Sequence, residues 1–137
     1  MPAKPALSLF LLPAALAVGA CGSDSDKGSG SADKQATPAV AIREIGETRD
    51  ALTAALATYK GGDARAAADQ AAEAYVQHFE AVEGPLGRQD ADLKEHLEEA
   101  IGQDVRKAMQ DGKPAAQVEQ TVNTIIADLD KAEAALR

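Results

Sequence analysis

The sequence predicts an all-α fold, an up-down-up-down four-helix bundle behind a signal peptide and a flexible linker. Apolar residues recur at three- and four-residue spacings along residues 38–137, as they do on one face of a helix. Glycine and proline interrupt this spacing at three places, where turns are expected. Alanine is abundant and aromatic residues make up 3% of the chain, which favours closely packed helices over sheets. Short turns make consecutive helices antiparallel.

Residues 1–20 have the pattern of a secretory signal peptide. Lys4 gives a weakly positive start, and residues 6–17 form an apolar run that leads through small residues to Cys21, the single cysteine. The run contains Pro13 and is shorter than the roughly 20 apolar residues that a spanning helix needs. The alternative is an ordinary signal peptide beside a chance cysteine.

The residues Val18-Gly19-Ala20-Cys21 resemble the lipobox of bacterial lipoproteins, although position 18 is more often leucine in that family. The resemblance implies cleavage before Cys21 and attachment of a diacylglyceryl and fatty-acyl (palmitate) anchor to the mature first residue. We therefore expect an extracytoplasmic protein of the cell envelope, held on the membrane by lipid. With its one thiol used in this way, the chain would form no disulfide.

Residues 21–37 are predicted to be a lipidated cysteine and a flexible linker. After the cysteine they contain no apolar residue larger than alanine, so they cannot bury a core. Residues 38–137 then form one domain. The net charge of −8 becomes one unit more negative when Lys4 is removed with the signal peptide. Such a charge argues against nucleic acid and against docking on anionic lipid headgroups.

The first predicted helix runs from about Pro38 to Lys60. Pro38 suits a first helical turn, and Gly61-Gly62 is typical of a helix end. Asp63 then caps the second helix by accepting free backbone N–H groups. The apolar face of the first helix consists of Ile42, Ile45, Leu52, Leu56 and Tyr59.

The second helix is expected to stop at Gly84-Pro85, and the third to start near Asp90 or Asp92. Asp92 with Glu95 resembles a capping box. The apolar faces of these two helices are Ala68, Ala72, Tyr75, Phe79 and Val82, and then Leu93, Leu97, Ala100, Ile101, Val105 and Ala108.

Gly112 is predicted to end the third helix, and Pro114 to begin the fourth. Gly46 and Gly102 lie inside predicted helices, where each costs about 1 kcal/mol relative to alanine, so we expect close helix approach at both. The fourth apolar face consists of Val118, Val122, Ile125, Leu129, Ala132 and Leu136.

The sequence contains no Gly-rich phosphate loop, no CxxC and no HExxH, and we expect that the protein is not an enzyme. Antiparallel winding would gather carboxylates and both histidines of the mature chain at one end of the bundle, with His78 level with His96. Carboxylate and imidazole groups suit iron, manganese or zinc. The alternative, solvated charges on helix flanks, stays open. The residues of this acidic end are Glu44, Glu47, His78, Glu80, Glu83, Glu95, His96, Glu98, Glu99, Asp128 and Asp130.

Residues 45–137 resemble the extracytoplasmic helical domain of bacterial high-affinity iron permeases. The resemblance rests on residues 59–63 (YKGGD), on Ala74-Tyr75 and above all on residues 78–86 (HFEAVEGPL), with its Phe-Glu-x-x-Glu-Gly core. It implies a metal-handling domain, with iron or another divalent metal as its cofactor. We take Glu80, Glu83, His78 and Glu98 as the candidate metal ligands, and expect Tyr75 to hydrogen-bond a carboxylate such as Glu98.

In those permeases a multi-spanning part follows this domain, whereas the present sequence ends at Arg137. We therefore expect a lipid-anchored metal-binding accessory of a membrane iron permease, with membrane lipid and that permease as partners. The alternative is a non-catalytic module that docks an envelope protein without metal. Residues 43–47 (REIGE) also match a motif of permease membrane helices, but Glu47 points away from the apolar face, and we interpret this match as coincidence.

Overall fold

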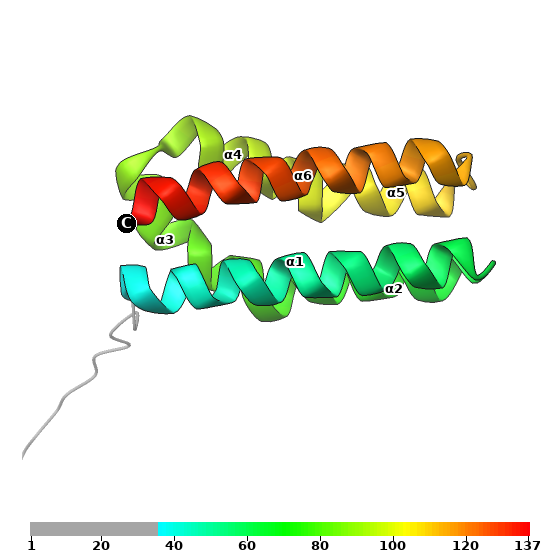
Figure 1. Cartoon of the computed structure of the whole chain (residues 1–137), viewed down its shortest axis with the longest axis horizontal. Helices are drawn as coiled ribbons and strands as arrows, with labels where there is room; N and C mark the ends of the chain where they lie inside the picture. The colour runs from blue at the N-terminus through cyan, green and yellow to red at the C-terminus, as the bar shows by residue number, and fades with distance from the viewer. Residues whose placement is uncertain (1–35) are drawn as a thin grey trace, which may run out of the picture. The chain divides into compact units, whose positions relative to one another are not determined.

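Helical rods joined by short turns make up residues 36–137, the part of the chain that the computed structural model describes (Figure 1). These residues contain helices and no strand, so the all-α prediction is confirmed. The predicted signal peptide, Cys21 and the linker up to residue 35 lie outside the described residues. Across residues 36–137 no helix combines the length and the apolar character that crossing a bilayer requires.

The first rod is helix α1 (Pro38–Lys60). The Thr37 side chain caps it by accepting a hydrogen bond from the Val40 N–H at 3.3 Å, and Pro38 occupies a first-turn position where a missing N–H costs nothing. The rod ends at two glycines, and Gly62 has φ 98°, a conformation that residues with a Cβ adopt rarely. These ends are the ones that the sequence predicts.

The second rod is continuous from α2 (Ala64–Ala74) through a π-helical turn, η1 (Tyr75–Phe79), to α3 (Glu80–Gln89). As predicted, Asp63 caps it, accepting from the Ala66 N–H at 2.9 Å. The turn takes one residue more than an α-helical turn. The buried positions accordingly jump from Ala74 to Phe79, a spacing of five.

The prediction that the second rod stops at Gly84-Pro85 is wrong, because Pro85 lies inside α3 and the rod continues to Gln89. Proline removes one backbone donor and crowds the carbonyl four residues earlier, which usually ends a helix. Here Pro85 and Leu86 are both buried. Burying this apolar pair favours continued helix and offsets the local cost.

The third rod is likewise continuous, from α4 (Ala91–Glu99) through a second π turn, η2 (Ala100–Asp104), to α5 (Val105–Gln110). Asp90 caps it by accepting from the Leu93 N–H at 2.9 Å. Of the two predicted starts Asp90 is therefore correct, and the capping box at Asp92 is wrong because Asp92 already lies in the first turn.

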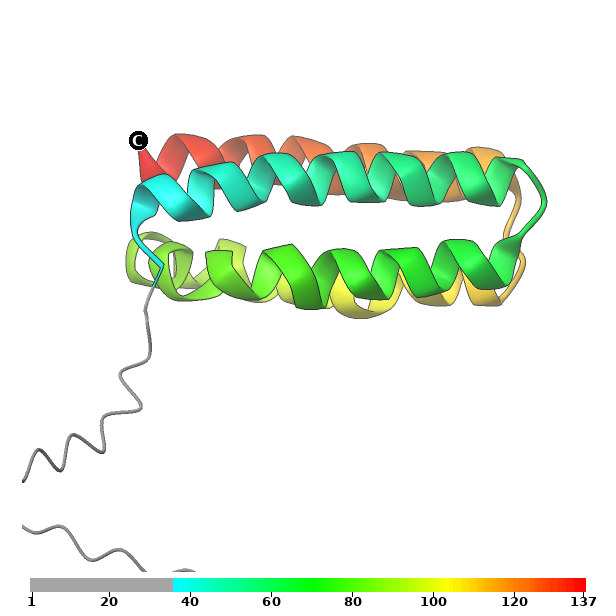
Figure 2. The same cartoon turned by 90° about the horizontal axis from the view of Figure 1, so that it is seen from below.

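The fourth rod is α6 (Ala115–Leu136), which follows a turn at Gly112, with φ 65°, and is preceded by Pro114. The rods lie side by side, with α1 against α2 and α6, and α2 against α5 (Figures 1 and 2). All four contribute to one buried core, whose largest side chains include Ile45, Leu52, Phe79, Leu86, Leu97, Ile101, Met109, Ile125 and Leu129.

Alanines let the first two rods pack closely. Ala67, Ala71 and Ala74 of α2 are 0–1% exposed, and α2 contacts α1 along its length. The expected close approach at Gly46 is wrong, since a Cβ added there would meet no atom within 4 Å outside its own helix backbone. At Gly102 the expectation is correct, because an added Cβ would lie 3.6 Å from the ring of Tyr75.

Candidate functional site

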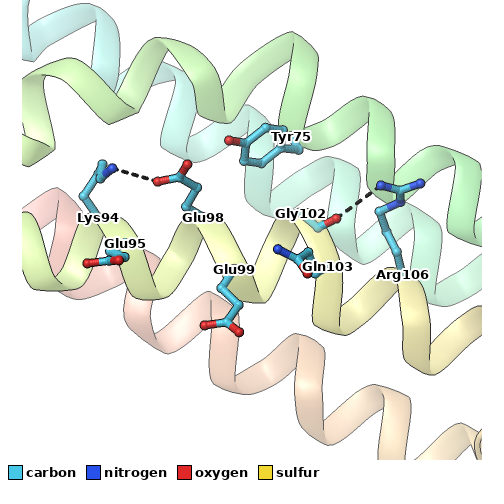
Figure 3. A pocket seen from close by; sticks show the side chains of 8 residues that line it. All are labelled: Tyr75, Lys94, Glu95, Glu98, Glu99, Gly102, Gln103 and Arg106. Atoms are coloured by element: carbon cyan, nitrogen blue, oxygen red, sulfur yellow. Dashed lines mark hydrogen bonds and ion pairs between the residues drawn. The ribbon is translucent and has the colours of Figure 1, made fainter.

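One residue of each π turn takes part in a contact between the second and third rods. Tyr75 opens η1, Gly102 lies in the middle of η2, and the tyrosine ring lies next to the glycine α-carbon. π-helical turns are rare and often occur at functional sites. Because Gly102 has no side chain, the ring of Tyr75 can lie close to the third rod, beside a groove between the two rods (Figure 3).

This groove has a volume of about 610 Å³. The phenol oxygen of Tyr75 points toward the carboxylate of Glu98, while Glu99 points away from the ring (Figure 3). Lys94 and Arg106 lie on either side of the ring, on the third rod. The lining residues are Tyr75, Lys94, Glu95, Glu98, Glu99, Gly102, Gln103 and Arg106.

Tyr75 donates its phenol hydrogen to Oε1 of Glu83, one of the predicted ligands. The predicted partner Glu98 is therefore wrong. Burial of the phenol, the hydrogen bond to Glu83 and the charges of Glu83, Glu98 and Glu80 together raise the pKa of Tyr75 far above its ordinary value. Three of the four predicted ligands thus act electrostatically on this one hydroxyl, which stays protonated and orients the Glu83 carboxylate.

Glu98 accepts a hydrogen bond from Nζ of Lys94 at 2.7 Å, in an ion pair one helical turn apart. This bond, and then the charges of Glu98, Glu83 and Glu95, raise the pKa of the Lys94 ammonium. Lys94 therefore lies in the field of both Glu83 and Glu98. The Lys94 ammonium therefore already lies beside the Glu98 carboxylate, where a metal ion would also be attracted.

His78 points to a different side of the second rod. Its Nδ1 lies 2.9 Å from Oε2 of Glu44 on α1, and its ring lines a small hollow between α1 and α2. Hydrogen bonds from Arg43 and then from His78 lower the pKa of Glu44. The fourth predicted ligand, Glu80, is exposed. The prediction therefore groups residues of the second rod that lie on different faces of it.

His96 also pairs with the neighbouring rod. Its Nε2 lies 3.1 Å from Oδ2 of the buried Asp128 on α6, and the Lys131 ammonium donates to Oδ1 of the same carboxylate at 2.6 Å. Hydrogen bonds from Lys131 and from His96 lower the pKa of Asp128, although its burial opposes them. The two histidines therefore connect different pairs of rods and share no site.

Across residues 36–137 no three His, Cys, Asp or Glu side chains come together as a ready metal-binding group. The predicted set Glu80, Glu83, His78 and Glu98 is thus not assembled as one site. Glu83 and Glu98 both lie close enough to Tyr75 and Lys94 for their charges to raise the pKa values of these two groups. Glu80 is exposed, and its charge raises the pKa of Tyr75.

The sequence analysis did not find the cations of the groove. Lys94 and Glu98 are four residues apart on one helix, a spacing that indicates an ion pair and could have been recognised. Arg106 carries no comparable signal. Its Nη1 donates to the Gly102 carbonyl at 3.2 Å, and its Nε is buried without a hydrogen-bond partner.

The chain shows no significant similarity to any family model, curated protein or solved structure that it was compared with.

Proposed function

We propose that this chain is a lipid-anchored extracytoplasmic protein whose four rods form an up-down-up-down bundle. We propose further that it binds iron or another divalent metal as an accessory of a membrane iron-uptake system. Support for the anchor comes from the residues that precede and include Cys21. Support for metal binding comes from one observation, the approach of the Glu83 and Glu98 carboxylates, from two different rods, to Tyr75 and Lys94.

The proposed ligands are the carboxylates of Glu83 and Glu98, with Glu80 one turn before Glu83 as a third. Oxygen ligands of this kind suit iron and manganese. The incoming ion would displace the Lys94 ammonium, which is partly exposed and can turn toward solvent. Tyr75 would remain a donor to Glu83 and keep that carboxylate oriented, as outer partners of metal ligands commonly do. His78 lines the small hollow between α1 and α2 and is not part of the proposed ligand set.

The alternative function is an envelope-protein docking module, and the described surface offers it less support. Among residues 36–137, Val76 is the exposed large apolar residue, with 59% of its surface accessible to solvent. Single exposed apolar side chains are ordinary, whereas docking surfaces usually present a contiguous patch. The groove of charged and polar residues is the more specific feature.

Calorimetry on the purified full chain, kept in detergent, tests the proposal. Titration with Mn²⁺, and with Fe²⁺ without oxygen, is expected to show one ion bound per chain. The Glu83→Gln, Glu98→Gln double variant should weaken binding at least tenfold, because it removes both charged ligands and keeps their size. Glu47→Gln is the matched control, since Glu47 is an exposed residue of the acidic end outside the groove.

A chain that binds neither ion would contradict the metal proposal. Equal weakening by Glu47→Gln and by the double variant would mean that general surface charge attracts the ion rather than the groove. In either case a cross-linking pull-down that returns one envelope protein, and is unaffected by chelator, would favour the docking module instead.

A further inference from the structure

We draw no further inference here: the strongest candidate, the pair of histidine–carboxylate contacts between rods (His78 with Glu44, and His96 with Asp128), would act through protonation of histidines that lie two residues from the proposed ligands Glu80 and Glu98, where a bound ion would itself shift that protonation.

Discussion

Tyr75 covers the α-carbon of Gly102 on the neighbouring rod, so that a Cβ added to the glycine would lie 3.6 Å from Cδ2 and Cε2 of the ring. Both residues belong to π turns, η1 and η2. The contact fixes the ring beside the groove and holds its hydroxyl where it reaches Glu83. The small size of residue 102 is therefore part of how the candidate site is built.

The effect of a substitution at Gly102 on the free energy of unfolding should depend steeply on the size of the new side chain. Gly102→Ala is expected to be neutral or to stabilise the protein by up to about 1 kcal/mol, since 3.6 Å is an ordinary contact and alanine favours helix. Gly102→Leu would enter the space of the Tyr75 ring and cost about 1–3 kcal/mol, as overpacking does. Urea denaturation measures both. Gly46→Leu, in open space, is the control, and an equal cost at the two glycines would contradict the described contact.

The phenol of Tyr75 is expected to titrate well above its ordinary pKa of 10.0, because burial and the bond to Glu83 disfavour the phenolate. The chain has two tyrosines, so Tyr59→Phe isolates the signal, and phenolate absorbance against pH measures it. Since the folded pKa is the higher one, this group's stabilisation is complete below about pH 10 and is lost as pH rises toward the folded pKa.

Glu83→Gln in the Tyr59→Phe background should bring the pKa of Tyr75 down, since the charged hydrogen-bond acceptor is removed while burial remains. Glu47→Gln in the same background should leave the titration unchanged. A Tyr75 midpoint that is the same in all three proteins would argue against the Tyr75–Glu83 hydrogen bond.

Glu44 should contribute to acid denaturation. Hydrogen bonds from Arg43 and His78 lower its folded pKa below 4.5, so its stabilisation is present above about pH 4.5 and is lost as pH falls through the folded value. Glu44→Gln is expected to cost about 1 kcal/mol at pH 6, the usual net value of such a hydrogen bond, and to flatten the fall in unfolding free energy below pH 4.5. Denaturant titrations from pH 6 to pH 3 measure this, and an acid limb as steep as that of the wild type would refute it.

Two nearby aspartates at the start of the third rod should contribute very differently to the stability of the protein. Asp90→Ala is expected to cost about 1 kcal/mol, because the Asp90 side chain caps α4 through the Leu93 N–H. Asp92→Ala should cost only a few tenths of a kcal/mol, the value of an acidic side chain in a first turn. Thermal unfolding of the two variants compares them directly. Equal losses, or a larger loss at Asp92, would favour the capping box over the observed cap.

The ends of the helices could be predicted from the sequence where a local rule decides them. Pro38, Asp63 and the glycines at 61, 62 and 112 act through backbone geometry or through hydrogen bonds to adjacent residues. Pro85 could not be judged in this way. Whether a proline ends a helix depends on how much its burial contributes, and burial is decided by rods distant in the sequence.

The π turns escaped prediction because a regular spacing was assumed along each rod. At about 100° per residue, Tyr75 and Glu83, eight residues apart, would lie about 80° from each other around an ideal α-helix. The extra residue of η1 slows the rotation and brings them to one face, where they bond. The sequence analysis grouped His78 with Glu83 as candidate ligands, whereas His78 contacts Glu44 on α1.

The carboxylates of the candidate site were predicted from sequence, but its cations were not. Glu83 and Glu98 were both among the candidate metal ligands that the sequence analysis named. Arg106 bonds a backbone carbonyl and its Nε has no hydrogen-bond partner. Such a missing partner can be recognised only when the side chains of all the neighbouring rods have been placed. A sequence shows which charges exist but not which of them remain uncompensated after folding.

The first rod begins and the fourth rod ends at the same side of the molecule, away from the turns at Gly62 and Gly112 (Figures 1 and 2). A short peptide could therefore join residue 137 to residue 38, and new termini could be opened at Gly62. If the proposed lipid anchor were placed at these new termini, the domain would be attached by the end that carries the turns. Such a circular permutant would test whether the function depends on the orientation of the domain at the membrane, with every side chain of the groove left unaltered.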